Sequence, residues 1–280
     1  MDNNGFFIIF TLSYFIYDGY FWGMKIQKSI RLILTFNTII VAILSITATF
    51  ICIYYEIYAD FPLTLIGIAV VFPIVFSIGT AYSRREKSLT YYGTLKAFGR
   101  AIYFASREWI PNSEQRYQEN LKGILRGLLG GLREMFMMKK EESAEKEKII
   151  YSKFSEISLF LKECRNRGMS PGEVSRANQY LSKMLDSFES MKHIYQYRTP
   201  ITLRAYSKIF TYTLPIVYGP YFANLAKGFS TGLFFVVPLL FSIILVSLDN
   251  IQDHLENPFD MVGEDDVVIN EEKFTRWLDL

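Results

Sequence analysis

The chain has 280 residues, of which half are hydrophobic, 16% are aromatic and only 21% are charged, with a formal net charge of +2. Its 24 phenylalanines, 19 tyrosines and three tryptophans exclude an intrinsically disordered protein. Two cysteines, Cys52 and Cys164, are too few for a secreted domain built on disulfides. The positions of the apolar residues along the chain are therefore the most informative feature of the sequence.

The first 31 residues are rich in aromatic side chains and come before the first long apolar run. Residues 5–12 are apolar, but no basic start precedes them and no small-residue cleavage site follows, so they are not a typical secretory signal. Aromatic rings prefer the boundary between membrane and water. We expect residues 1–31 to form an interfacial segment.

Four long runs contain no Asp, Glu, Lys or Arg. A helix needs about 20 apolar residues to cross the bilayer core. The runs 32–55 and 61–83 meet this length and predict a first transmembrane hairpin over 32–83. The runs 209–226 and 228–248 predict a second hairpin over 209–248, although two prolines interrupt the former. The alternative, buried helices of a large soluble core, does not suit four such runs in one chain.

The charges that flank these runs predict their orientation. Three basic residues precede the first run and three follow the second, whereas the turn between them holds two acidic residues and no basic one. By the positive-inside rule, both termini of this multi-pass protein are expected in the cytoplasm, beneath the plasma (inner) membrane. The residues concerned are Lys25, Lys28, Arg31, Arg84, Arg85 and Lys87, with Glu56 and Asp60 in the turn.

The two cytoplasmic parts differ in charge. Residues 84–208 hold 24 basic and 14 acidic residues, a net charge of +10, whereas residues 249–280 hold 10 acidic and two basic residues, a net charge of −8. The basic part is either a solvated surface near anionic lipid headgroups or a region that sets the potential at a pore or docks the acidic tail. Both interpretations are compatible with the sequence.

The region 84–208 has the pattern of a helical bundle. Apolar residues at helical spacing predict a helix over 149–160. Ser170, Pro171 and Glu173 form a helix start, with Ser170 as N-cap, and predict a helix from 171 to about 195. Four glycines among leucines between 123 and 131 indicate either close helix packing or a break. The four apolar positions are Ile150, Phe154, Ile157 and Leu161.

The sequence contains no pattern of residues typical of catalysis. His193 and His254 have no partner at metal-ligand spacing, and no phosphate-binding loop, dinucleotide fingerprint or nucleophile elbow is present. We therefore expect no enzyme activity, no cofactor and no nucleic-acid partner. The uncharged runs also lack ionisable residues, which argues against an ion-coupled carrier. A passive ion path or a membrane scaffold remains.

One stripe of the second run suits a passive path. Ile68, Phe72 and Phe76 follow each other at four-residue spacing and lie within about 80° of rotation on one helix face. A ring of subunits could place such stripes around an axis, where rings of apolar side chains gate by dewetting. Alternatively, the stripe faces lipid or the core of the subunit.

Three stretches in register with the hydropathy resemble the bestrophin family of ion channels, particularly its short bacterial members. The first follows the second run, with Tyr92 where the family has tryptophan before glycine. The second opens the second hairpin, with Thr202 where a further proline is usual. The third is an Asn-Pro-Phe signature after the last run. The matching residues are Ala81, Tyr82, Arg84, Glu86, Gly93, Pro200, Tyr206, Asn257, Pro258 and Phe259.

The resemblance implies an all-α membrane protein with four transmembrane helices and a cytoplasmic helical bundle, assembled as a homopentamer around one axial pore. It implies a hydrophobic neck at Ile68, Phe72 and Phe76 and a cytoplasmic constriction at Val174. Chloride and other small anions are the favoured permeant ions, with membrane lipid as the surrounding partner. A cation-selective channel of the same fold and a non-conducting scaffold are the alternatives.

Animal members of the family hold a calcium ion with the acidic cluster after the Asn-Pro-Phe signature. The residues of this character here are Asp260, Glu264, Asp265 and Asp266, whose oxygen ligands suit calcium. Met261 and Val262 interrupt the cluster, and bacterial members generally lack this calcium site. We therefore expect the acidic tail to dock against the basic cytoplasmic helices rather than to hold calcium.

Overall fold

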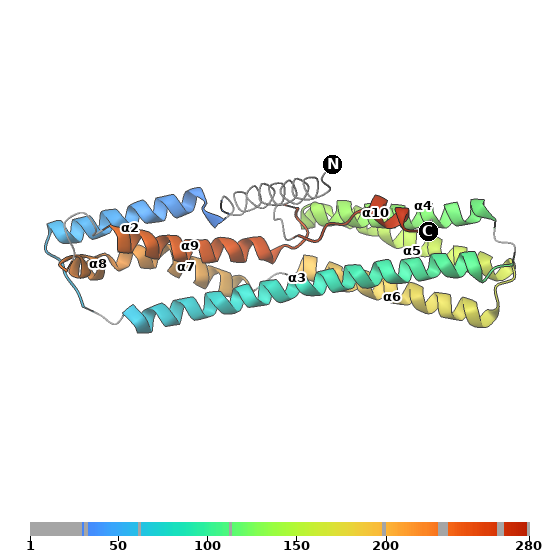
Figure 1. The fold of residues 1–280 in the computed structure, drawn as a ribbon, viewed down its shortest axis with the longest axis horizontal. Coiled ribbons are helices and arrows are strands. Elements are labelled where there is room, and N and C mark those ends of the chain that lie inside the picture. The colour runs from blue at the N-terminus through green and yellow to red at the C-terminus, as the bar shows by residue number, and fades with distance from the viewer. Residues whose placement is uncertain are drawn as a thin grey trace, which may run out of the picture. The chain divides into compact units, whose positions relative to one another are not determined.

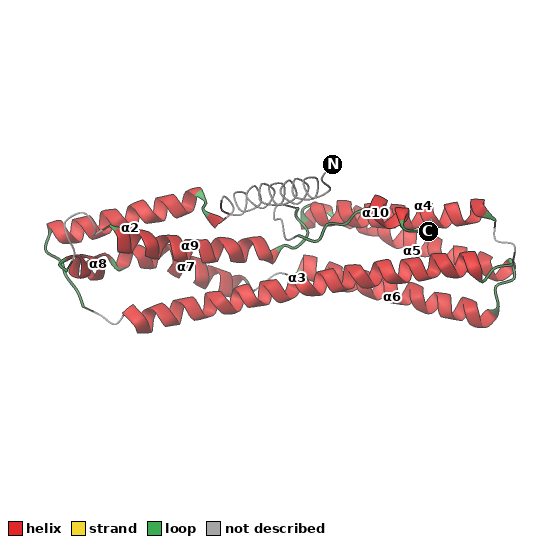
Figure 2. Cartoon of the chain, viewed as in Figure 1, coloured by secondary structure: helices red, strands yellow, loops and turns green. Residues whose placement is uncertain are grey.

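A computed structural model describes residues 30, 33–60, 63–111, 114–197, 200–228, 235–261 and 266–278. Over these ranges the regular elements are all helical and no strand is present, in agreement with the predicted fold class (Figure 2). The chain forms two compact units. Unit 1 comprises Met1–Ala81 and Thr199–Leu255, and unit 2 comprises Tyr82–Arg198 and Glu256–Leu280. The predicted interfacial segment 1–31 lies outside the described residues, apart from Ile30.

Unit 1 contains the apolar helices. Its helix α2 packs against α7 and α8, which follow each other along the chain (Figure 1). A Cβ atom on Gly219 would lie 3.2 Å from the backbone carbonyl of Ala48, so α2 can approach α8 this closely only at a glycine. The helices are α2 (Phe36–Tyr54), the first part of α3 (Leu63–Glu108), α7 (Ile201–Val217), α8 (Gly219–Ala226) and α9 (Val236–Glu256).

The core of unit 1 joins α3, α7, α8 and α9. On α3, the buried residues recur at helical spacing, so one face of the helix packs inward. They meet apolar residues of the other three helices in a single cluster. This cluster consists of Val70, Ile74, Leu214, Tyr218, Phe222 and Leu245.

Three described helices, α2, α3 and α9, are long and apolar enough to cross a membrane, which supports an integral membrane protein. The run 209–226 does not form one helix: α7 begins earlier, at Ile201, and ends at Val217, and α8 starts at Gly219. Pro220 explains the break because it cannot donate the backbone hydrogen bond that would continue α7. A fourth membrane-spanning segment stays a prediction.

Unit 2 contains the charged helices. Helix α5 packs against both α4 and α6, and α10 lies on α4 (Figure 1). The four apolar positions predicted to share a face are buried on α5, so that prediction is confirmed. The elements are the second part of α3, α4 (Gln115–Met137), the short 3-10 helix η1 (Lys140–Glu142), α5 (Ala144–Asn166), α6 (Pro171–Gln196) and α10 (Glu271–Arg276).

Two further local predictions are confirmed in unit 2. Helix α6 begins at Pro171, and the Ser170 hydroxyl accepts a hydrogen bond from the Glu173 amide while the Glu173 carboxylate accepts one from the Ser170 amide. The glycines of α4 do not break the helix. A Cβ atom on Gly131 would lie 3.4 Å from Ile150, so the small residues let α4 and α5 pack closely.

Candidate pore-lining site

The stripe Ile68, Phe72 and Phe76 lies on the face of α3 that points away from the core of unit 1. These side chains are 56%, 59% and 62% exposed, whereas Ile74, between them in the chain, is fully buried. The two phenylalanine rings make an edge-to-face contact with centroids 4.9 Å apart. The structure thus separates a packed face of α3 from an apolar face that the described part of unit 1 leaves uncovered.

An uncovered apolar stripe on a membrane-spanning helix faces lipid, a neighbouring helix or a narrow pore. Phenylalanine and isoleucine offer no hydrogen bonds to water, so a ring of them resists wetting and acts as a gate. Gly67 and Gly79 flank the stripe, and a Cβ atom on either would have no neighbour within 4 Å. Neighbouring helices can therefore approach α3 at both glycines.

Val174 differs from the stripe. It lies in the first turn of α6, as predicted, but its side chain is only 9% exposed and belongs to the core of unit 2. The adjacent Ser175 and Arg176 are exposed, as are Pro171 and Gly172 at the start of the helix. A constriction at Val174 stays a prediction.

The residues of the first family-like stretch lie on α3. Arg84 donates a hydrogen bond of 2.7 Å to the Ile194 carbonyl, and so joins α3 to α6 within unit 2. Tyr82 is exposed, and Glu86 pairs with the neighbouring Arg85. Gly93 has open space where a side chain would be. Arg84 is therefore the member of this stretch with a clear structural role in the subunit.

The other two stretches have structural roles as well. Pro200 is the N-cap residue of α7, and Tyr206 packs on Phe210 with ring centroids 4.5 Å apart. Phe259 is buried and stacks on Phe136 at 4.3 Å. The Pro258 carbonyl accepts a 2.7 Å hydrogen bond from the Val267 amide, and Asn257 directly follows the last residue of α9.

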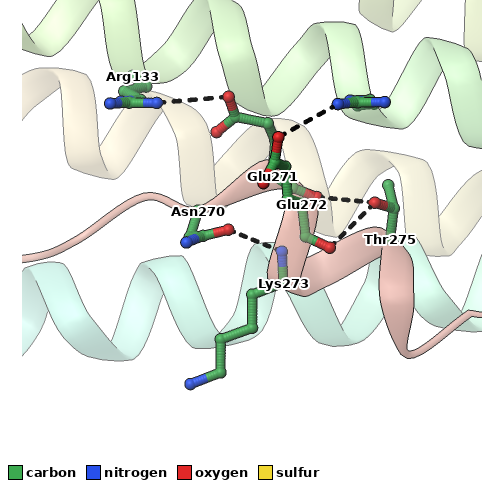
Figure 3. A network of polar contacts seen from close by, with 7 residues as sticks. Arg133, Asn270, Glu271, Glu272, Lys273 and Thr275 are labelled. Atoms are coloured by element: carbon green, nitrogen blue, oxygen red, sulfur yellow. Dashed lines mark hydrogen bonds and ion pairs between the residues drawn. The ribbon is translucent and has the colours of Figure 1, made fainter.

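The acidic C-terminal part docks on a basic helix of unit 2. Glu271 and Glu272 form ion pairs with Arg133 and Arg126 of α4, at 3.4 and 3.6 Å. Figure 3 shows Glu271 directed toward Arg133, and shows the Asn270 side chain capping α10 through the Lys273 amide at 2.7 Å. The expected docking of acidic tail and basic helices is therefore observed.

The calcium candidates are only partly described. Asp260 and Asp266 are half-buried, whereas Glu264 and Asp265 lie outside the described residues. Over the described ranges, no group of three or more His, Cys, Asp or Glu side chains is arranged to hold a metal ion. Calcium binding by the full cluster stays a prediction.

A charged network links α5 to α6. The Lys192 ammonium group donates hydrogen bonds to Glu147 at 3.0 Å and to the Tyr151 hydroxyl at 2.6 Å, and Tyr151 donates to Glu189. Burial alone would lower the pKa of Lys192, but the bonds to Glu189, Tyr151 and Glu147 raise it. Burial acts to raise the pKa of Glu189, yet Lys192 and Tyr151 lower it. Both groups are thus held in their charged forms.

The buried polar residues at the end of α9 were not predicted from the sequence. Its last uncharged run stops at Leu248, but the helix continues to Glu256 and includes Asp249, which is 1% exposed. Helix α9 therefore contains ionisable residues, although the uncharged run within it contains none. The sequence does contain a pattern that indicates this polar helix face, because Asp249, Gln252 and Asp253 recur at helical spacing.

The comparisons with solved structures agree with this architecture. A variant of a bacterial bestrophin homologue from Klebsiella pneumoniae matches with a TM-score of 0.74 and 17% identity, over 87% of this chain and 96% of that one. A second structure of that homologue matches with a TM-score of 0.73 and 16% identity, over the same shares. No protein-family model matches, and no curated protein is similar to the chain.

Proposed function

We propose, from the premise that this chain has a bestrophin-like fold, that it forms an ion channel. In this proposal the chain assembles as a homopentamer around one axial pore, with four membrane-spanning segments in each subunit and both termini in the cytoplasm. Ions diffuse through a hydrophobic neck formed by Ile68, Phe72 and Phe76. One chain is too small to enclose a pore and also pack its own helices.

The observation that carries the proposal is the pair of faces on α3. The packed face is buried, and the stripe with Phe72 and Phe76 is apolar, exposed and free of partners in the described part of its own unit. A helix that only contacted lipid would need no such alignment of two aromatic rings and an isoleucine between two close-approach glycines. The fold supplies the second argument, since the named relatives are bestrophin homologues.

We propose chloride and other small anions as the permeant ions. The segment 84–208, with its net charge of +10, supports this choice because a basic vestibule concentrates anions. The edges of the Phe72 and Phe76 rings carry partial positive charge and favour anions at the neck. The exposed outer turn with Glu56 and Asp60 acts in the opposite sense, because its acidic side chains attract cations.

The test is ion flux through the purified chain in liposomes. Replacing Ile68, Phe72 and Phe76 together by alanine should widen the neck and raise flux at a fixed driving force. Leu240→Ala, an exposed apolar change on α9, is the matched control and should leave flux unchanged. Identical flux from the triple variant and the parent would contradict a neck at this stripe, and no flux from either would favour a scaffold.

Selectivity follows from reversal potentials in a salt gradient across a planar bilayer. An anion channel shifts the reversal potential toward the equilibrium potential of chloride, whereas a cation channel of the same fold shifts it in the opposite direction. The second outcome would refute the anion assignment and leave the channel proposal intact.

A further inference from the structure

The interior of unit 1 contains buried oxygens that lack hydrogen-bond partners. Ser77 of α3, Thr211 of α7 and Asp249 of α9 are each at most 1% exposed. Within the described residues, neither hydroxyl makes a hydrogen bond, and neither carboxylate oxygen of Asp249 does. The Tyr212 hydroxyl of α7 lies near this carboxylate and can donate to it. Such groups are strongly destabilising when buried among apolar residues, so the arrangement indicates a ligand.

These three residues each lie one helical turn from a member of the apolar cluster of unit 1. Ile74, Leu214 and Leu245, from the same three helices, meet in one apolar cluster. In unit 1, α3 and α9 run in one direction and α7 runs in the other (Figure 1). One turn after Ile74 on α3 lies Ser77, and one turn after Leu245 on α9 lies Asp249. On the antiparallel α7, Thr211 lies one turn before Leu214. Each of these polar residues is on the same helix face as its apolar neighbour. An apolar layer is thus followed by a polar layer.

Four other hydroxyls of unit 1 are bonded within their own helices. Thr49 on α2, Thr80 on α3, Thr213 on α7 and Ser242 on α9 each donate to the carbonyl four residues earlier, at 2.7 to 2.9 Å. Ser77 and Thr211 do not make this bond, so their hydroxyls are available to a ligand. Pro215 has no N–H group, which also leaves the Thr211 carbonyl without its usual helical donor.

Two further oxygens border the polar layer. The side-chain oxygens of Gln252 and Ser207 are buried and without hydrogen bonds in the described residues. They lie one turn further along α9 and one turn back along α7. All these groups are oxygens, and hard cations are the ligands that carboxylate, hydroxyl and carbonyl oxygens prefer.

The charge of the layer selects a monovalent cation. The basic residues nearby, Arg204 and Lys208, bond to Asp253 at 3.2 and 2.8 Å at the half-exposed end of the helices. Asp249 lies one turn deeper, where Lys208 and Arg204 act on it through space without an ion pair to it. One buried carboxylate is neutralised by one positive charge, whereas calcium sites use several carboxylates.

We propose that each subunit binds a monovalent cation such as Na⁺ in this layer, through Asp249, Thr211 and Ser77, with Gln252 and Ser207 completing the oxygen shell. Ser77 lies on the α3 face opposite Phe72, so this ion is behind the helix that carries the stripe and outside the proposed ion path. A bound cation would tie α3, α7 and α9 together. The site does not depend on whether the chain conducts ions.

The test uses the purified full-length chain in detergent. Binding of radiolabelled Na⁺ and thermal unfolding are measured in NaCl and in N-methylglucamine chloride at equal ionic strength. The parent should show saturable Na⁺ binding and a rise in melting temperature of roughly 5–10 °C at about 100 times the Kd. Asp249→Asn, which keeps the side-chain shape, should abolish both effects.

Two more variants keep the test decisive. Thr211→Val should weaken Na⁺ binding roughly tenfold, as expected for the loss of one ligand to a charged group. Ser242→Ala removes a buried hydroxyl of α9 that is already bonded to Pro238, and should bind Na⁺ like the parent. Absence of saturable binding by the parent, or an equal Na⁺ response in Asp249→Asn, would overturn the site. Stabilisation by Ca²⁺ alone would overturn its assignment to a monovalent ion.

Discussion

The C-terminal segment of unit 2 allows apolar anchoring and ion pairing to be separated by experiment. Two ion pairs, the partly exposed Glu271–Arg133 and the exposed Glu272–Arg126, connect the segment to α4. Four apolar side chains of the same segment are almost fully buried. We predict that Phe274→Ala releases the segment, whereas Glu271→Gln combined with Glu272→Gln does not. The four buried side chains are Val267, Ile269, Phe274 and Leu278.

The magnitudes decide the outcome. Truncating a buried phenylalanine to alanine costs about 3–5 kcal/mol, and Phe274 is only 3% exposed. The Arg100 guanidinium, 5.3 Å from the ring centroid, adds about 0.5–1 kcal/mol that the substitution also removes. Each exposed ion pair contributes about 0–1 kcal/mol and is screened by salt. Removing both pairs should therefore cost less than about 2 kcal/mol.

Hydrogen exchange of the amides in residues 267–278 measures the release directly. Phe274→Ala should raise exchange throughout the segment at low and high salt, while the double glutamine variant should stay near the parent. Trp277→Ala, half-exposed in the same segment, is the matched control. If the double glutamine variant at low salt exchanges as fast as Phe274→Ala, then electrostatic docking holds the segment and the packing argument is wrong.

Three further predictions concern other parts of the chain. Ile74→Ala, in the buried face of α3, should lower the free energy of unfolding by about 2–5 kcal/mol. Phe72→Ala, on the exposed face, should change it by less than about 0.5 kcal/mol. Equal losses in thermal unfolding would mean that both faces are packed. Ser170→Ala should cost about 1 kcal/mol through loss of the α6 cap, with Ser175→Ala as the control. Because the pKa of Glu189 is lowered in the fold, its contribution is present above the ordinary glutamate pKa of about 4.3 and is lost as the pH falls below it. Glu189→Gln should flatten this acid limb, and an unchanged pH profile of thermal unfolding would refute it.

Local features could be predicted well from the sequence. Helix α6 begins where Ser170, Pro171 and Glu173 predict it, because a capping box depends only on neighbouring residues. The buried face of α5 follows from the spacing of its apolar residues. The stripe on α3 was likewise visible from its spacing, but a pattern alone could not tell an exposed face from a buried one.

The ends of the apolar helices were harder to predict. Counting uncharged residues placed the last run at 228–248, whereas α9 extends to Glu256, because helix formation continues through Asp249, Asp253 and their polar neighbours. The charge boundary after Ser83 is likewise inside α3, which runs on to Glu108. Loss of apolar character marks where a helix leaves the apolar environment, and not where its hydrogen bonding stops.

The sequence by itself determined the class of the protein: the length of the uncharged runs demands helices in an apolar environment, and the +10 and −8 segments require separate polar regions. Only the tertiary structure decided which side of each helix is used. It turned Ile74 inward and Phe72 outward on α3, buried Val174, and brought Asp249 beside α7. These outcomes depend on contacts between residues of different helices, such as Ile74 in one cluster with Leu214 and Leu245, and the spacing along one helix contains no information about them.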